Sequence, residues 1–282
     1  MAKLIFKILA VLPFIQSIST QNNIPFKIKE NTVVCEALFS KDGKEKTLAA
    51  GLIIADQYVV TCYHFYTAFG KYPKPLYIVV RYNFRSNDEY DSVEATGEFS
   101  VLPTQYDFSK HHYEPKDYST DIIVLKLAKK IIAPPIELPN FVTKQGDTLY
   151  SLGLTRHIVD GTTFINREFA PLEYVFTYYF APKRNPIYIA VLGDVKEGFS
   201  GAGLFNAKGQ VLGMIQFGWD NWSKEIDDIR SSGGISENIY NSITSGYARG
   251  QRIGFAINMG WLIDNYLIGY MHLPPPAIPK YP

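Results

Sequence analysis

The sequence predicts an all-β protein of sandwich or barrel architecture. Apolar stretches of strand length recur at roughly ten-residue spacing, and turn-forming residues separate them. Aromatic residues make up 15% of the 282 residues, and together with abundant Val and Ile they favour strands over helices. Apolar residues reach 46% and charged residues 20%, so the chain can bury a sizeable core. The length fits one large domain or two small ones.

The first 20 residues show the pattern of a signal peptide. Lys3 and Lys7 accompany an apolar run from Leu4 to Ile15, and small residues follow, with cleavage expected near Ser19 to Gln21. An uncleaved N-terminal anchor is the alternative, but the run is short for a membrane-spanning helix. No later segment is long and apolar enough to cross a bilayer. We therefore expect a secreted or periplasmic protein without stable membrane insertion after removal of residues 1–20.

Charge and cysteine content exclude several classes of function. The net charge of +1, without a basic patch or an acidic tail, argues against nucleic acid as the main partner. The two cysteines, Cys35 and Cys62, each lie in an apolar stretch. Export permits a disulfide between them, and two buried free thiols are the alternative. Two cysteines make neither a disulfide scaffold nor a metal site, so we expect no bound metal.

The first half of the chain has the pattern of short strands joined by tight turns. We expect strands over residues 32–39, 47–55, 58–61, 76–82, 92–101 and 121–127. Asp42-Gly43 indicates a hairpin turn after the first of them. The other segments are predicted to be a loose leader over residues 21–30, a short helical turn over 65–70 and an irregular loop over 103–120.

The three prolines in residues 132–140 break this pattern and indicate a linker between two halves. We therefore predict an N-terminal domain over residues 21–135 and a C-terminal domain over 136–272. Strands in the second half are expected over residues 148–152, 162–169, 172–180, 187–191, 204–205, 211–215 and 252–258. The remaining segments are a long polar loop over 219–251, a C-terminal helix over 259–270 and a proline-rich tail over 273–282.

Gly198-Phe199-Ser200-Gly201 is the candidate nucleophile loop. It places a hydroxyl between two glycines just before an apolar strand. Glycine allows backbone angles that let several N–H groups point at one spot. A serine on such a loop can attack a carbonyl while backbone N–H groups stabilise the oxyanion. A tight turn with a solvated serine is the simpler interpretation, so this function requires a base and an orienting acid elsewhere in the chain.

His64 and Asp121 are the candidate base and acid. Among five histidines, only His64 directly follows a predicted strand, and a strand end is a rigid mount for a base. Asp121 heads the apolar strand that ends at Leu127, which can draw its carboxylate inward. Asp117, in a less regular setting, is the alternative acid.

Three stretches in the order His, Asp, Ser resemble the signatures of the chymotrypsin-like serine peptidases: TCYH after GLIIADQYVV, DIIVLKL, and GFSG followed by GLFN. Gly146-Asp147 with Gly153, the segment 204–213 and Gly254 to Asn258 further resemble the HtrA-type bacterial proteases. The resemblance covers about residues 30–270, and no PDZ-like segment follows. An α/β-hydrolase esterase does not fit, because that class has the order serine, acid, histidine.

The resemblance implies two six-stranded antiparallel β-barrels of the trypsin-like fold, a C-terminal helix and a site between the barrels. It also implies a serine endopeptidase that acts on polypeptides without a cofactor or metal. His64 and Asp121 would come from the first barrel and Ser200 from the second, with the N–H groups of Gly198 and Ser200 as the oxyanion hole. Asp194 and Phe217 would belong to the substrate pocket.

Two departures from the family leave a second function open. Phe199 occupies the position where digestive members have an aspartate that pairs with a newly cut N-terminus, so activation by that route is not expected. Ala202-Gly203 replaces the usual Gly-Pro after the serine. The alternative is therefore a catalytically inactive binding module on the same fold.

Overall fold

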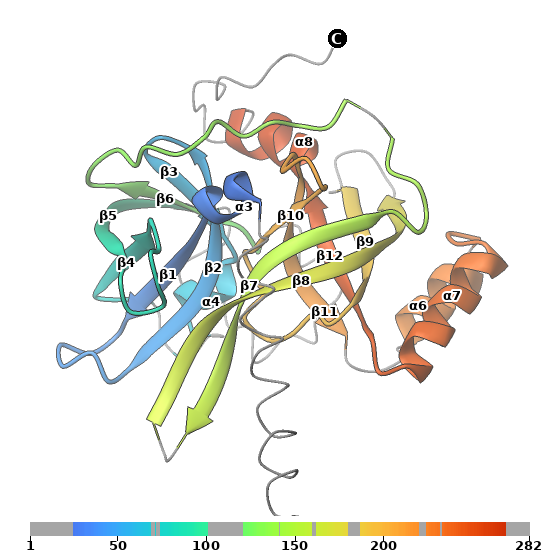
Figure 1. Cartoon of the computed structure of the whole chain (residues 1–282), viewed down its shortest axis with the longest axis horizontal. Helices are drawn as coiled ribbons and strands as arrows, with labels where there is room; N and C mark the ends of the chain where they lie inside the picture. Colours follow the sequence, from blue (N-terminus) through green and yellow to red (C-terminus); the bar gives the residue numbers. More distant parts are fainter. Residues whose placement is uncertain are drawn as a thin grey trace, which may run out of the picture.

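The computed structural model describes residues 25–68, 71, 74–100, 121–140, 142–159, 162–179, 187–219, 224–231 and 233–268. Its strands form two closed six-stranded barrels whose neighbouring strands all pair antiparallel (Figure 1). This arrangement confirms the predicted all-β fold. The predicted signal peptide (1–20), the loop 103–120 and the tail 273–282 lie outside the described residues.

The first barrel consists of six strands from the N-terminal half of the chain. They are β1 (Thr32–Leu38), β2 (Lys46–Ala55), β3 (Tyr58–Thr61), β4 (Tyr77–Tyr82), β5 (Asp91–Ser100) and β6 (Ile123–Leu127). Their order around the barrel is β1-β2-β3-β6-β5-β4. The predicted hairpin turn between β1 and β2 is present, with Gly43 at a φ of 69°. A short helix, α4 (Tyr63–Tyr66), follows β3; it begins two residues before the predicted helical turn over 65–70 and overlaps it only at Phe65 and Tyr66.

The second barrel repeats this architecture with the C-terminal strands. They are β7 (Thr148–Val159), β8 (Thr162–Tyr179), β9 (Ile187–Gly193), β10 (Gly203–Phe205), β11 (Val211–Trp219) and β12 (Arg252–Asn258). Their order is β10-β11-β12-β9-β8-β7. The linker between the barrels has neither helix nor strand over residues 128–140. It is fixed to the second barrel by the N–H of Val211, which donates to the carbonyl of Glu137 at 2.8 Å.

One hydrophobic cluster, the shared core, spans both barrels, beside separate clusters within each barrel. A single cluster of buried side chains contains Leu52 and Ile122 from the first half together with Leu152, Phe205 and Met214 from the second. Each of these side chains is at most 1% exposed. Burial of apolar area at this junction contributes about 25 cal/mol per Å² and resists separation of the barrels. The residues flanking the junction are therefore held at fixed separations.

The expected leader over residues 21–30 is wrong in its described part. Residues Phe26–Asn31 form a short helix, α3. Pro25 precedes the helix, where its fixed φ is compatible with helix entry. Ile28 is fully buried in the shared core. Because this helix packs on the core through one buried isoleucine, the spacing of apolar residues in the sequence could not indicate a helix here.

The sequence predicts two strands where β8 is a single strand that continues through Pro171. Pairing of β8 with β9 begins only at Leu172, opposite Gly193. The missing N–H of Pro171 therefore removes no hydrogen bond from the β8–β9 ladder, and the proline is tolerated.

The expected polar loop over residues 219–251 is also wrong, because its described part contains two helices. These are α6 (Lys224–Ser231) and α7 (Glu237–Ala248), which lie beside the second barrel in Figure 1. Ser236 caps α7 by accepting a hydrogen bond from the N–H of Ile239 at 3.3 Å. Ile226 and Ile243, both fully buried, attach the helices to the core.

The expected C-terminal helix is present in an unusual form. A three-residue helical turn, α8 (Met259–Trp261), continues into a π-helix over Leu262–Ile268. Asn258 caps it by accepting a hydrogen bond from the N–H of Trp261 at 3.0 Å. Leu262 and Leu267 pack into the shared core.

Glu36 is expected to make the first barrel sensitive to acid. Its side chain is 5% exposed on β1 and forms ion pairs with Lys46 at 2.8 Å and with Arg81. Burial alone would raise the pKa of Glu36, but the hydrogen bonds and charges of Lys46 and Arg81 lower it below its usual value. The stabilisation is therefore complete above the unfolded pKa of about 4.3 and is lost as the pH falls through the folded value.

We expect Glu36→Gln to lower the free energy of unfolding by about 2 kcal/mol at pH 7 and by much less near pH 3. Urea denaturation at both pH values measures this difference. Glu94→Gln, at an exposed position on β5, is the matched control and should have little effect at either pH. An equal loss for Glu36→Gln at both pH values would contradict the assignment.

Candidate active site

Ser200 lies on the loop between β9 and β10, and backbone hydrogen bonds fix it against both barrels. Its carbonyl accepts a hydrogen bond from the N–H of Ala50 on β2 at 3.1 Å. The next residue, Gly201, donates its N–H to the carbonyl of Ile215 on β11 at 2.7 Å. The serine is thus held at the junction of the barrels by main-chain contacts.

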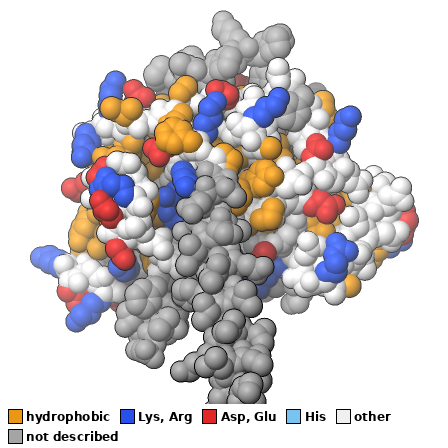
Figure 2. Space-filling model, viewed as in Figure 1, with side chains coloured by type: hydrophobic (Ala, Val, Ile, Leu, Met, Phe, Trp, Pro, Cys, Tyr) orange, Lys and Arg blue, Asp and Glu red, His pale blue; other side chains and the backbone are white. Residues whose placement is uncertain are grey.

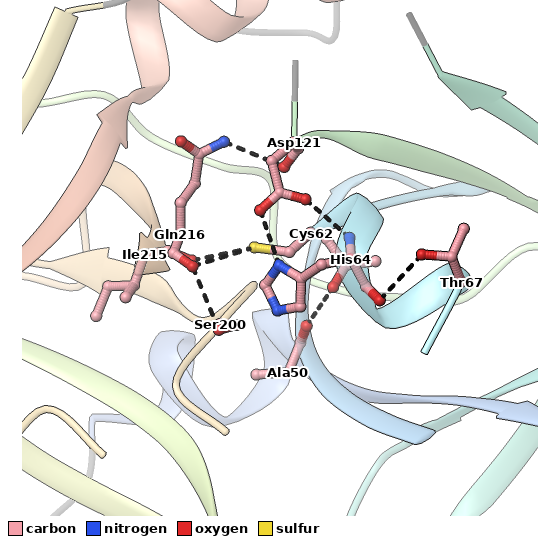
Figure 3. Close-up of polar contacts among 9 residues, drawn as sticks. Ala50, Cys62, His64, Thr67, Asp121, Ser200, Ile215 and Gln216 are labelled. Carbon is pink, nitrogen blue, oxygen red and sulfur yellow. Dashed lines mark hydrogen bonds and ion pairs between the residues drawn. The ribbon is translucent and has the colours of Figure 1, made fainter. Parts of the chain in front are cut away.

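The first barrel places His64 and Asp121 in direct contact (Figure 3). His64 lies in α4 directly after β3, and Asp121 lies just before β6, the strand that pairs with β3. One carboxylate oxygen of Asp121 accepts the backbone N–H of His64 at 2.8 Å, and the other lies 2.8 Å from Nδ1. Both residues are buried, at 7% and 1% exposure.

This two-point contact determines the role that the imidazole can play. A carboxylate accepts hydrogen bonds, so the proton of a neutral His64 ring lies on Nδ1. Nε2 is then the basic nitrogen, and it is the ring nitrogen turned away from Asp121 in Figure 3. The alternative acid, Asp117, lies outside the described residues.

The hydroxyl of Ser200 donates to the backbone carbonyl of Gln216 at 3.3 Å. In sites without substrate, hydrogen bonds that serve catalysis are often long or poorly aligned and tighten only in the complex. Gln216, whose carbonyl accepts from the Ser200 hydroxyl, donates its side-chain amide to the carbonyl of Asp121 at 3.2 Å, so Ser200 lies in the same cluster as Asp121 and His64 (Figure 3). The structure therefore brings all three predicted residues to one place.

Gln216 is a site residue that sequence reasoning missed. Its side chain is 1% exposed, and its Nε2 donates to the backbone carbonyl of Asp121 at 3.2 Å. Through its side chain and its carbonyl, Gln216 links Asp121 of the first barrel to Ser200 of the second. The only signal in the sequence is a polar residue within the otherwise apolar strand β11.

The residues before Ser200 form a tight turn. The N–H of Phe199 donates to the carbonyl of Lys196 at 3.1 Å, and Gly198 has a φ of 92°. An i to i+3 hydrogen bond with a positive φ at the third residue defines a type II turn. Within the described part of the chain, the N–H groups of Gly198 and Ser200 donate to no acceptor. Two such free donors next to a serine hydroxyl can stabilise an oxyanion.

Phe199, the main departure from the family pattern, is fully buried in a hydrophobic cluster of the second barrel. Its ring covers Gly153 on β7 so closely that a Cβ at Gly153 would lie 2.4 Å from it. Phe199 therefore packs on β7 at the position where digestive members have an aspartate that pairs with a newly cut N-terminus.

Both cysteines are free and buried, so these two residues form no disulfide. The Cys62 thiol lies 3.5 Å from the carbonyl of Ile215, and burial raises its pKa well above the usual value, with the charge of Asp121 adding to this. Donor atoms of Cys62, His64 and Asp121 lie within 4.8 Å of one another. Nδ1 of His64 is already engaged by the Asp121 carboxylate, so two of these three groups bind each other.

The two residues predicted for the substrate pocket differ in environment. The side chain of Asp194 is 66% exposed and forms an ion pair with Lys196 at 2.9 Å. An exposed carboxylate that already has a cation does not fit the base of a pocket for basic side chains. Phe217 is half-buried and stacks on Phe255, with ring centroids 5.0 Å apart. It therefore packs against β12 as part of the barrel wall.

Comparison with solved structures finds similar chains among proteases. The active form of the Rv3671c protease from M. tuberculosis is 18% identical, with 83% of this chain and 78% of that chain covered and a TM-score of 0.47. A structure titled as that of GrC is 16% identical, with 89% and 97% covered and a TM-score of 0.52. A tripeptide-bound variant of the HtrA-type protease AlgW is 18% identical, with 87% and 62% covered and a TM-score of 0.50.

The structures of GrC and AlgW support the trypsin-like fold, and at these identities they support the fold alone. A search of curated proteins finds no match. The sequence model of the family described as the trypsin-like peptidase domain matches residues 49–214, which is more than half of the 282 residues. This match contains the stretches that carry His64, Asp121 and Ser200. The chain therefore belongs to the family of trypsin-like peptidase domains.

Proposed function

We propose that the protein is an exported serine endopeptidase that hydrolyses polypeptides. The observation that carries this proposal is the double contact of Asp121 with His64, beside a serine whose loop offers two N–H donors without an acceptor among the described residues. The family supports a serine protease that acts on polypeptide substrates. On the face shown in Figure 2, basic and acidic side chains are interspersed, so no single-sign patch there favours nucleic acid.

In the proposed mechanism His64 Nε2 takes the proton of the Ser200 hydroxyl as Oγ attacks the scissile carbonyl. The carbonyl oxygen becomes an oxyanion, which the N–H groups of Gly198 and Ser200 stabilise. Asp121 stabilises the imidazolium and keeps its orientation. The imidazolium then protonates the leaving amine, which gives an acyl-enzyme. A water molecule, deprotonated by His64, attacks the ester and regenerates Ser200.

Labelling with a fluorophosphonate probe tests this proposal directly. The native protein should be labelled at Ser200, because the probe reacts with a serine activated by its base. Ser200→Ala and heat-denatured protein are the controls, and neither should be labelled. The Ser200–Gln216 hydrogen bond is the observation that favours the alternative of an inactive binding module. Native protein that resists labelling would support that alternative.

Export is part of the proposal and rests on the signal-peptide pattern of residues 1–20. Among the described residues, no helix has both the length and the apolar character required to cross a bilayer. Expression of the full chain should release a mature protein whose N-terminus lies near Gln21. N-terminal sequencing of the released protein measures this, and retention of residues 1–20 would contradict export by cleavage.

The position of Asp194 predicts that the enzyme does not select lysine or arginine before the scissile bond. Lys196 occupies its carboxylate, and most of its side chain faces solvent. A peptide-library profile should show no more than about a twofold preference for basic residues at this position, because a screened surface charge contributes little. Asp194→Asn should give the same profile. A strong basic preference that Asp194→Asn removes would restore the pocket assignment.

A further inference from the structure

We propose that Glu168 and Lys196 form a positioning pair that keeps the oxyanion turn, residues Lys196–Phe199, in its type II conformation. The inference builds on the proposed function, because it concerns the N–H donors that the reaction requires. It assigns a role to two charged side chains that are not members of the predicted triad of His64, Asp121 and Ser200.

The ion pair joins the turn to the wall of the second barrel. Lys196 Nζ lies 2.6 Å from Oε1 of Glu168 on β8 and 2.9 Å from Oδ2 of Asp194 at the end of β9. The Glu168 side chain is 33% exposed, whereas Asp194 is 66% exposed. The less exposed partner is the less screened by solvent, so Glu168 makes the more important of the two contacts.

Lys196 is the residue whose backbone closes the turn. Its carbonyl accepts the N–H of Phe199 at 3.1 Å. Fixing its side chain on β8 therefore fixes one end of the hydrogen bond that defines the turn. Burial lowers the pKa of Lys196, but the hydrogen bonds to Glu168 and Asp194 and the charges of both residues raise it by more, so the net shift of the pKa is upward. The ammonium group is charged at neutral pH.

The other end of the turn is attached to the same part of the β7–β8 ladder. Glu168 pairs directly with Gly153, and directly opposed residues point to the same face of a sheet. The Phe199 ring covers Gly153, so the ring lies on the face of the β7–β8 ladder to which the Glu168 side chain points. The N–H of Leu154, the next residue on β7, donates to the carbonyl of Gly198 at 3.0 Å.

These contacts form a clamp that consists of the Lys196–Glu168 ion pair, the Phe199–Gly153 contact and the Leu154–Gly198 hydrogen bond. The clamp holds the turn from both ends and, among the described residues, leaves the N–H groups of Gly198 and Ser200 without acceptors. All of its members belong to the second barrel, and none of them is a newly cut N-terminus. The clamp therefore explains how a loop with Phe199 in place of an aspartate can stay formed.

Kinetics of Glu168→Gln test the pair. We expect kcat to fall about tenfold with KM changed less than twofold, because a displaced donor weakens oxyanion binding more than substrate binding. The affinity for a peptide boronate, whose tetrahedral adduct occupies the oxyanion site, should fall by the same factor as kcat. Lys196→Arg keeps the charge and should retain most of the activity. Glu237→Gln, which removes the exposed ion pair with Arg230, is the matched control.

Hydrogen exchange gives a readout that does not depend on activity. In Glu168→Gln the amides of Phe199 and Leu154 should exchange about tenfold faster, and in Glu237→Gln they should be unchanged. A Glu168→Gln protein with unchanged kcat and unchanged exchange would overturn the inference, as would a loss of kcat that boronate affinity does not follow. If Glu168→Gln does not fold, Lys196→Met provides the same measurements. A wild-type protein without activity would contradict the proposed function, and the exchange rates would still decide whether the pair holds the turn.

Discussion

Replacing Asp121 with Asn is expected to lower kcat about ten-thousand-fold while KM stays within a few-fold of the wild type. The Asp121 carboxylate accepts two hydrogen bonds from His64, one from the backbone N–H and one from Nδ1. An asparagine amide has one oxygen and one NH₂ group, so it can accept only one of them. If the oxygen keeps the backbone bond, the NH₂ group faces Nδ1 and selects the tautomer with the proton on Nε2. That imidazole cannot accept the proton of Ser200.

Steady-state kinetics against pH distinguish this mechanism from a loss of folding. Asp121→Asn should keep its melting temperature within a few degrees, because the amide preserves shape and one hydrogen bond. Activity should recover partly at high pH, where hydroxide can replace the missing base. Asp88→Asn makes the same chemical change at an exposed carboxylate far along the chain from the triad and serves as the control. Full activity in Asp121→Asn would refute the assignment of Asp121 and favour Asp117.

The parts of the site that were predictable from sequence are those fixed by strand ends. His64 follows β3 and Asp121 precedes β6, and the antiparallel pairing of these strands brings the two residues together. Ser200 was predictable because glycines flank it before an apolar strand. Each of these signals lies within a short segment of the chain, where hydrophobic pattern and turn residues are informative.

Gln216 could not be predicted, because its role comes from a contact across 95 residues of sequence. It pairs a side chain of the second barrel with a backbone carbonyl of the first. No local pattern specifies which carbonyl a buried amide will reach. The same limit applies to Lys196 and Glu168. In the sequence they look like ordinary surface charges, and only the structure shows that they form an ion pair between β8 and the oxyanion turn.

The errors in the fold have local causes. Helices α6 and α7 lie in a segment rich in Gly, Ser and Asn, which lowers its helix propensity. The burial of Ile226 and Ile243 against the second barrel outweighs that propensity. Pro171 suggested a break in β8, but β8 pairs with β9 only from Leu172 onward, so the missing N–H of the proline removes no hydrogen bond from that ladder. In both places tertiary packing decided the local structure.

Gly201→Ala is expected to have the largest effect on stability, lowering the free energy of unfolding by about 4 kcal/mol. Gly201 has a φ of 84°, which an alanine adopts only with strain. A Cβ at this position would lie 2.0 Å from the carbonyl oxygen of Ala50 and 2.4 Å from Oγ1 of Thr61. Thr61 Oγ1 already donates to that carbonyl at 2.6 Å, so neither atom can move without losing the bond.

The same substitution should abolish activity, because it pushes Ser200 away from the first barrel. Ala50 donates its N–H to the Ser200 carbonyl, and the new methyl group would collide with the carbonyl of the same residue, Ala50.

Gly250→Ala is the control that distinguishes backbone strain from a steric clash. Gly250 has a φ of 76°, but none of the described atoms lies within 4 Å of the position of its new methyl group. We expect it to cost only about 1 kcal/mol and to leave activity intact. Urea denaturation and fluorophosphonate labelling measure both effects. If the two variants lose the same free energy of unfolding, backbone strain alone requires glycine at position 201, and the close contact with Ala50 and Thr61 of the first barrel does not.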